Sequence, residues 1–185
     1  PEDTAESEFW ALNYSFRPEL SATTYALFAV KSNSNTETSG AIGVIGKGTI
    51  IGGRAVRPLA GSNNLFHSVI FGLDYKDFDQ SVGFEDTFDT PIKYVNWTTG
   101  YTGVIFEGGR EHNLNAFANA GVRGVVNEAD QFTENRQGTK PNYFYLRGSY
   151  DLLQPAPLET AVFFRLSGQW TAQPLISNEQ FSIGG

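Results

Sequence analysis

The chain has 185 residues, with 20 acidic and 13 basic side chains and neither cysteine nor methionine. Its formal net charge of −7 argues against a nucleic-acid partner, which needs a basic surface. The lack of cysteine excludes disulfides and thiolate metal sites. Glycine (20 residues) and aromatic residues (15 Phe, 8 Tyr and 3 Trp) are abundant, which is typical of closed β architectures with aromatic girdles.

No signal peptide can be read at the start of the sequence. The chain begins at Pro1 rather than at methionine, so we expect it to be part of a longer or processed precursor. The first residues contain no apolar core of a signal peptide. No apolar run approaches the ~18 residues of a membrane helix.

Alternating apolar and polar residues predict strands in the first half of the chain. In the first of these, Trp10 and Tyr14 share one face and Asn13 the other. A glycine-rich strand places Arg54 opposite Ile51. The expected strands cover residues 8–17, 23–32, 44–57 and 66–79.

The second half of the chain repeats this pattern, with strands expected over residues 92–106, 112–127, 143–152 and 161–171. Gly108-Gly109 between two alternating runs predicts a tight hairpin turn. A turn is also expected at Gln154–Pro157, where prolines interrupt the pattern. No segment predicts a helix, so the fold class is all-β, a single antiparallel up-and-down meander of about eight long strands.

The expected connections alternate between short turns and long polar loops. Short turns fall near Pro18, Gly61, Gly108 and Pro155, and long loops near Asn35, Glu85 and Glu134. One end of the sheet would therefore carry only turns and the other only loops, as in outer-membrane barrels. Several strands exceed the roughly 9–11 residues that a transmembrane strand needs, whereas soluble strands average about 5–6.

The faces of the strand over residues 112–127 support the same interpretation. Asn113, Asn115 and Asn119 lie on a face that is too polar for a dry core, while Leu114 and Ala118 lie on the other. In a membrane barrel the apolar face meets lipid and the polar face a wet lumen. The sequence therefore predicts one domain, residues 1–185, that forms part of a transmembrane β-barrel.

Several segments resemble, in the same order, the two-partner secretion transporters of the hemolysin secretion/activation family. They are Phe66–Ser68, Phe71–Phe78, Thr90–Tyr94, Pro141–Gly148, Arg165–Gln169 and Gln173–Gly185, and the last is the most specific. The resemblance implies a barrel of sixteen strands preceded by periplasmic POTRA modules. It also implies export of one large unfolded partner protein through the barrel. The eight expected strands would be the fourth to eleventh, and the sequence stops where the family's Val-Arg-Gly-Tyr loop tip would begin.

Six charged side chains are expected to line the lumen: Arg54, Asp74, Lys76, Arg123, Arg147 and Arg165. They are candidates for transient contacts with a passing chain, or for structural ion pairs across strands. Five aromatic side chains are expected to anchor the barrel at the membrane interfaces: Trp10, Tyr14, Trp97, Tyr101 and Trp170. His67 and His112 have no second ligand at metal spacing, so no metal site, cofactor or catalytic set is expected.

These observations predict a pore in the bacterial outer membrane, a monomer whose partners are outer-membrane lipid and a secreted exoprotein. The protein is not expected to be an enzyme. Two alternatives stay open at this point. A passive porin would have the same wall and no protein partner. A soluble β-sandwich with glycan-binding or adhesin loops would bury the apolar face against a second sheet.

Overall fold

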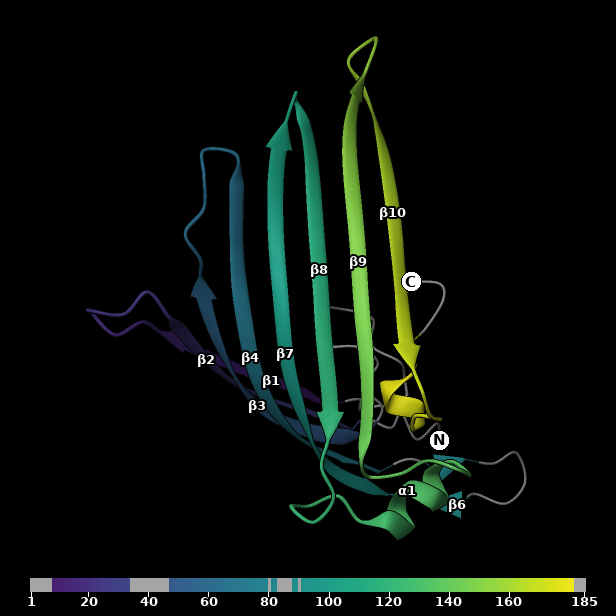
Figure 1. The fold of residues 1–185 in the computed structure, drawn as a ribbon. Helices are drawn as coiled ribbons and strands as arrows, with labels where there is room; N and C mark the ends of the chain where they lie inside the picture. The colour runs from purple at the N-terminus through teal and green to yellow at the C-terminus, as the bar shows by residue number, and fades with distance from the viewer. Residues whose placement is uncertain (1–7, 34–46, 80, 83–87, 90, 182–185) are drawn as a thin grey trace, which may run out of the picture.

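Eight long strands form one open antiparallel sheet in the order β1-β2-β3-β4-β7-β8-β9-β10 (Figure 1). The computed structural model describes residues 8–33, 47–79, 81–82, 88–89 and 91–181. The strands are β1 (Phe9–Phe16), β2 (Thr24–Ser32), β3 (Gly48–Pro58), β4 (Leu65–Phe78), β7 (Ile92–Glu107), β8 (Arg110–Gly121), β9 (Tyr143–Ala156) and β10 (Thr160–Thr171). β5 (Ser81–Val82) and β6 (Phe88–Asp89) pair separately. The predicted all-β meander is thus confirmed.

The strand boundaries agree with the sequence pattern to within a few residues, with two marked differences. β8 ends at Gly121, six residues before the predicted end. β9 continues through Pro155 to Ala156, where a turn was expected. Among the described strands only β10 flanks Pro155, because the pairing of β9 with β8 ends at Leu153. The missing N–H of proline therefore leaves no ladder bond unmade on the β8 side. Residues 44–46, expected to begin β3, lie outside the described residues, as do Asn35 and Glu85.

Turns and loops are sorted to opposite ends of the sheet, as the sequence predicted. We call the end with the connections β1–β2, β3–β4, β7–β8 and β9–β10 the turn end, and the opposite end the loop end (Figure 1). At the β7–β8 turn, Gly108 and Gly109 have φ of 57° and 78°, the left-handed region that a tight two-residue hairpin requires.

The prediction that the chain has no helix is wrong at the loop end. The long polar loop after β8 contains α1 (Ala129–Asn135), and the segment after β10 contains a short 3-10 helix, η1 (Ser177–Glu179). The single apolar side chain in the middle of α1, Phe132, is fully buried, with its ring 5.9 Å from that of Tyr94 and 6.1 Å from that of Tyr143. One residue gives no periodic signal in the sequence, yet it packs the helix against the sheet.

At the loop end, a buried side chain also makes hydrogen bonds that a neighbouring strand would otherwise make. β7 extends beyond the end of β8, and there Asn127 takes the place of the missing partner. Its Oδ1 accepts a hydrogen bond from the backbone N–H of Val95 at 2.8 Å, and its Nδ2 donates to the carbonyl of Pro141 at 3.3 Å. Asn127 is 2% exposed, so it satisfies backbone groups that would otherwise be buried without partners.

The sheet is curved, and its two faces differ in kind. The convex face carries apolar side chains that remain exposed, among them Trp10, Leu12, Leu27, Phe71, Leu73, Trp97, Leu114, Phe144, Leu146, Phe164, Leu166 and Trp170. In the part of the chain that the structure describes, no second sheet covers them. The concave face carries the polar and charged side chains, as the alternation in sequence predicted.

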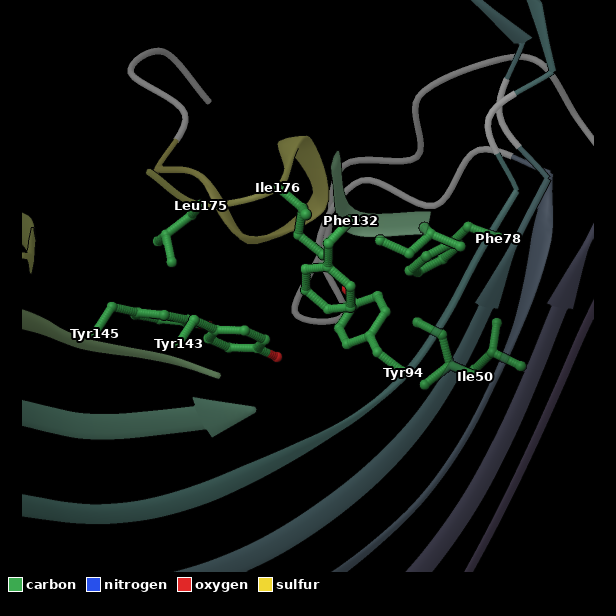
Figure 2. Close-up of a cluster of buried hydrophobic side chains, with 10 residues drawn as sticks. Ile50, Phe78, Tyr94, Phe132, Tyr143, Tyr145, Leu175 and Ile176 are labelled. Carbon is green, nitrogen blue, oxygen red and sulfur yellow. The ribbon is translucent and has the colours of Figure 1, made fainter. Parts of the chain in front are cut away.

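A compact apolar core sits on the concave face at the loop end, where the strands curve around it (Figure 2). It contains Val30, Ile50, Phe78, Ile92, Tyr94, Phe132, Tyr143, Tyr145, Leu175 and Ile176. Strands, α1 and the segment after β10 all contribute to it. This core lies beside the polar groups described next.

Candidate functional site: the polar concave wall

Opposite charges pair across neighbouring strands on the concave wall. Arg54 of β3 makes a two-pronged ion pair with Asp74 of β4, through Nη1 to Oδ1 and through Nη2 to Oδ2 at 2.8 Å. The guanidinium also lies over the ring of Phe28, 5.1 Å from its centre. Asp74 is 5% exposed, so the pair is held away from solvent on the acidic side. Both residues were predicted to line the lumen, and they contact each other.

Amide and hydroxyl groups continue the polar wall toward β9. Asn96 of β7 donates to Oδ1 of Asn119 on β8 at 3.2 Å, and Thr98 donates to the same oxygen at 2.8 Å. The hydroxyl of Tyr143 donates to Oδ1 of Asn96 at 3.0 Å. Both asparagines are buried, and they are satisfied by one another, as buried polar groups must be.

The segment of residues 172–181, which we call the strap, folds back from the end of β10 onto the concave wall. Its Glu179 is only 3% exposed and reaches three side chains of the wall. Oε1 lies 2.5 Å from Nζ of Lys76 and accepts from the hydroxyl of Tyr94 at 2.6 Å. Oε2 accepts from the hydroxyl of Tyr145 at 2.5 Å. Each oxygen of this buried carboxylate therefore has at least one donor.

The electrostatic balance at Glu179 favours its ionised form. Burial acts to raise the pKa of this carboxyl, but the charge of the Lys76 ammonium and the hydrogen bonds from Lys76, Tyr145 and Tyr94 act against it. Their combined effect places the pKa below the ordinary value of a glutamate. The strap thus carries a negative charge into the wall at neutral pH.

The remaining predicted wall residues on β9 and β10 differ in their pairing. Arg165 of β10 makes an exposed ion pair with Asp151 of β9, with Nε to Oδ1 at 2.7 Å. Arg147 of β9 has no carboxylate partner among the described residues. It lies over the ring of Tyr145, and its Nη2 makes a long hydrogen bond of 3.5 Å to the carbonyl of Gln180 in the strap.

Arg123 does not lie on the wall, contrary to the expectation from sequence. β8 ends at Gly121, and Arg123 follows in an exposed turn bridged to Asn127. The sequence alternation predicted a longer strand. In the structure, Asn127 and α1 instead lie beside the loop end of β7. Its backbone N–H is held by Oδ1 of Asn142 at 2.6 Å.

The predicted anchor aromatics all lie on the convex face. Trp10, Trp97 and Trp170 sit in the halves of their strands nearer the loop end and are at least half exposed. Tyr14 and Tyr101 lie nearer the turn end. The hydroxyl of Tyr101 is 3.0 Å from Nδ1 of His67.

Sequence reasoning missed Glu179 as a site residue. Its partners Lys76, Tyr94 and Tyr145 lie 103, 85 and 34 residues away along the chain, so no local pattern connects them. One signal was present: Glu179 is the only acidic residue after Glu159. It is also the only charged residue after Arg165, so it stands alone in an uncharged stretch of the sequence.

No group of three or more His, Asp or Glu side chains within the described residues could hold a metal ion. Over the same residues, no helix is long and apolar enough to cross a membrane. A scan against protein-family models and searches of curated proteins and of solved structures found no match to this chain.

Proposed function

We propose that this chain forms part of the wall of a transmembrane pore in the bacterial outer membrane. The single observation that carries the proposal is the sheet with an exposed apolar convex face and a charged concave face. In water, a contiguous apolar surface of this extent is unfavourable, whereas in a bilayer it is the required outer surface. The concave face would then line a hydrated lumen.

Strand length and the sorting of connections support the same role. β4 and β9 have 14 residues each, β7 has 16, and β8 and β10 have 12, enough to cross a hydrocarbon core that needs about 9–11. Short turns at one end and long loops at the other match the periplasmic and extracellular sides of such barrels. A soluble sandwich gains no support, since in the described part of the chain Leu114 and Val122 are about half exposed rather than packed against a second layer.

A closed pore requires partners for the edges of the sheet. In the described residues β1 and β10 each pair on one side only, and an open edge in lipid leaves backbone groups unsatisfied at several kcal/mol each. We therefore propose that further strands pair with these edges in the complete barrel. This agrees with the sixteen-stranded barrel implied by the family resemblance.

The cargo proposed for the pore is a large partner protein, exported in an extended state without catalysis by the barrel. The resemblance of Gln173–Gly185 and the other segments to two-partner secretion transporters suggests this cargo, and the strap on the concave wall suits a lumen that handles polypeptide. A passive porin is the second candidate, favoured by the balanced ion pairs Arg54–Asp74 and Arg165–Asp151, which hydrate a channel without binding anything.

The test combines extraction, conductance and secretion. We expect the protein to leave outer membranes only in detergent, and the full-length protein to conduct ions in planar bilayers. Replacing Arg147 and Arg165 by glutamine should slow secretion of the partner and change conductance. Release of the protein by salt or alkali alone would rule out the pore. Altered conductance with unchanged secretion would favour the porin.

A further inference from the structure

The strap is held on the concave wall in a way that resembles a bound peptide more than an integral strand. Its described backbone–backbone hydrogen bonds are local, from Glu179 N–H to the carbonyl of Ile176 and from Gln180 N–H to that of Ser177. It pairs with no strand of the sheet among the described residues. Removal of the strap would therefore leave every ladder of the sheet intact.

Side chains outside the strap form hydrogen bonds with its main chain. Arg136 donates to the carbonyl of Leu175 at 3.0 Å, Gln169 donates to that of Glu179 at 2.8 Å, and Arg147 reaches that of Gln180. Asn135 accepts from the backbone N–H of Ser177 at 3.3 Å. Contacts of this kind recognise the backbone carbonyl and N–H groups of a segment whatever its sequence.

Three side chains of the strap each occupy a specific position on the concave wall. Leu175 and Ile176 are buried among the aromatic rings of the core, beside Phe132, Tyr94 and Tyr143 (Figure 2). Three positions after Ile176, the carboxylate of Glu179 enters the pocket formed by Lys76, Tyr94 and Tyr145. Between these anchors Ser177 is exposed, whereas Asn178 is half-buried and its buried Oδ1 has no hydrogen-bond partner among the described residues. The surface therefore selects two successive apolar residues followed, at the third position after them, by an acid.

We propose that this surface is a binding site for a polypeptide segment with that pattern, bent by a single 3-10 turn between the apolar pair and the acid, and that the strap occupies it as an internal substitute for the ligand. The inference deepens the proposed function, since the ligand would be a segment of the exported chain, and it rests on that function for its biological meaning. With the strap in place, the site is closed. A passing segment that offers the same two apolar residues and the same acid displaces the strap and gains its contacts.

Arg147 gives the site capacity that the strap does not use. Its Nε is buried and has no hydrogen-bond partner in the described part of the chain, and its Nη2 makes only the long bond to Gln180. A guanidinium with unused donors favours an acceptor that fits better than the strap carbonyl. An exported segment with a further carbonyl or carboxylate at this point would therefore bind more tightly than the strap itself.

The test uses the full protein in detergent and a fluorescent peptide with the sequence of residues 173–180, QPLISNEQ. A peptide with glutamine in place of its glutamate serves as the matched ligand. In the wild-type protein the tethered strap competes, so the peptide should bind weakly. In the Glu179→Gln variant the strap loses its carboxylate, and we expect the peptide to bind at least tenfold more tightly than to wild type, and at least tenfold more tightly than the glutamine peptide does.

Two controls make each result decisive. Glu111→Gln removes another carboxylate of the concave wall, which accepts a hydrogen bond from Asn113 and makes no hydrogen bond to the strap among the described residues, and should leave peptide binding at the wild-type level. Because the chain has no cysteine, the pair N135C/S177C can lock the strap, and oxidation should abolish peptide binding until the disulfide is reduced.

Absence of binding to Glu179→Gln, equal affinity for the two peptides, or full binding to the oxidised, locked protein would each overturn the proposal. These outcomes are independent of conductance and secretion. A failure of the pore would leave peptide binding intact, and a failure of peptide binding would leave the pore intact.

Discussion

Charge placed on the convex face separates a lipid-facing sheet from a water-facing one. Leu166 of β10 is 62% exposed, and its neighbour Ser167, on the concave wall, is exposed as well. Arginine at either position meets no steric barrier. In water both substitutions should therefore cost little, within about 0.5 kcal/mol, as is usual at exposed sites.

In a bilayer the two positions should differ sharply. Leu166 lies five residues from the nearer end of β10 at Thr171, roughly 17 Å along the strand at ~3.4 Å per residue. With a strand tilt of about 40°, the depth is roughly 13 Å, near the midplane of a ~30 Å hydrocarbon core. An arginine on the lipid face at this depth costs about 2–4 kcal/mol. At Ser167 it would enter the wet lumen and cost far less.

The measurement is equilibrium unfolding of the full protein from lipid vesicles in denaturant, for Leu166→Arg and Ser167→Arg beside wild type. We expect the unfolding free energy to fall by about 2–4 kcal/mol for the first variant and by less than about 1 kcal/mol for the second. Equal losses in the two variants, of whatever size, would refute the assignment of the convex face to lipid.

Three further predictions concern the loop end. The folded pKa of Glu179 lies below its unfolded value near 4.5, so its ionised form stabilises strap docking above that pH. This contribution is lost as pH falls through the folded pKa. Hydrogen exchange of the strap amides should therefore rise in that range in wild type and not in Glu179→Gln. Asn127→Ala removes the acceptor for a buried backbone N–H and should lower the unfolding free energy by about 1–3 kcal/mol, whereas a loss below 0.5 would contradict its role as a strand substitute. Gly121→Ala places a methyl group 2.2 Å from the ring of Tyr143 and should cost about 1–3 kcal/mol in the same assay, while Gly148→Ala, with its nearest atom at 3.4 Å, should cost clearly less.

Local alternation was enough to predict the sheet and its two faces. Successive side chains of a strand point to opposite sides, so the sequence around Leu114 and Asn115 carries the assignment of both faces by itself. The pair Gly108-Gly109 likewise specified its turn, because few other residues adopt left-handed conformations without strain. Charged wall residues such as Arg54 and Asp74 followed from the same parity, although their mutual ion pair did not.

The features that the sequence did not predict all depend on distant contacts. Phe132 stabilises α1 because it packs against rings from β7 and β9. Beyond the end of β8, Asn127 accepts a hydrogen bond from the backbone N–H of Val95 in β7, a group that no described strand pairs on that side. Pro155 was expected to end its strand, because proline has no backbone N–H to donate. Its effect depends on whether the strand is paired on both sides there, and among the described strands only β10 pairs with it.

The amino-acid sequence by itself thus determined the strands, their order, the sorting of turns and loops, and which side chains are apolar-facing or polar-facing, since each of these follows from neighbours a few residues apart. Tertiary structure alone decided where the strap lies and why Glu179 is ionised while buried. That carboxylate depends on Lys76, Tyr94 and Tyr145, which three different parts of the chain bring together only after the sheet has curved.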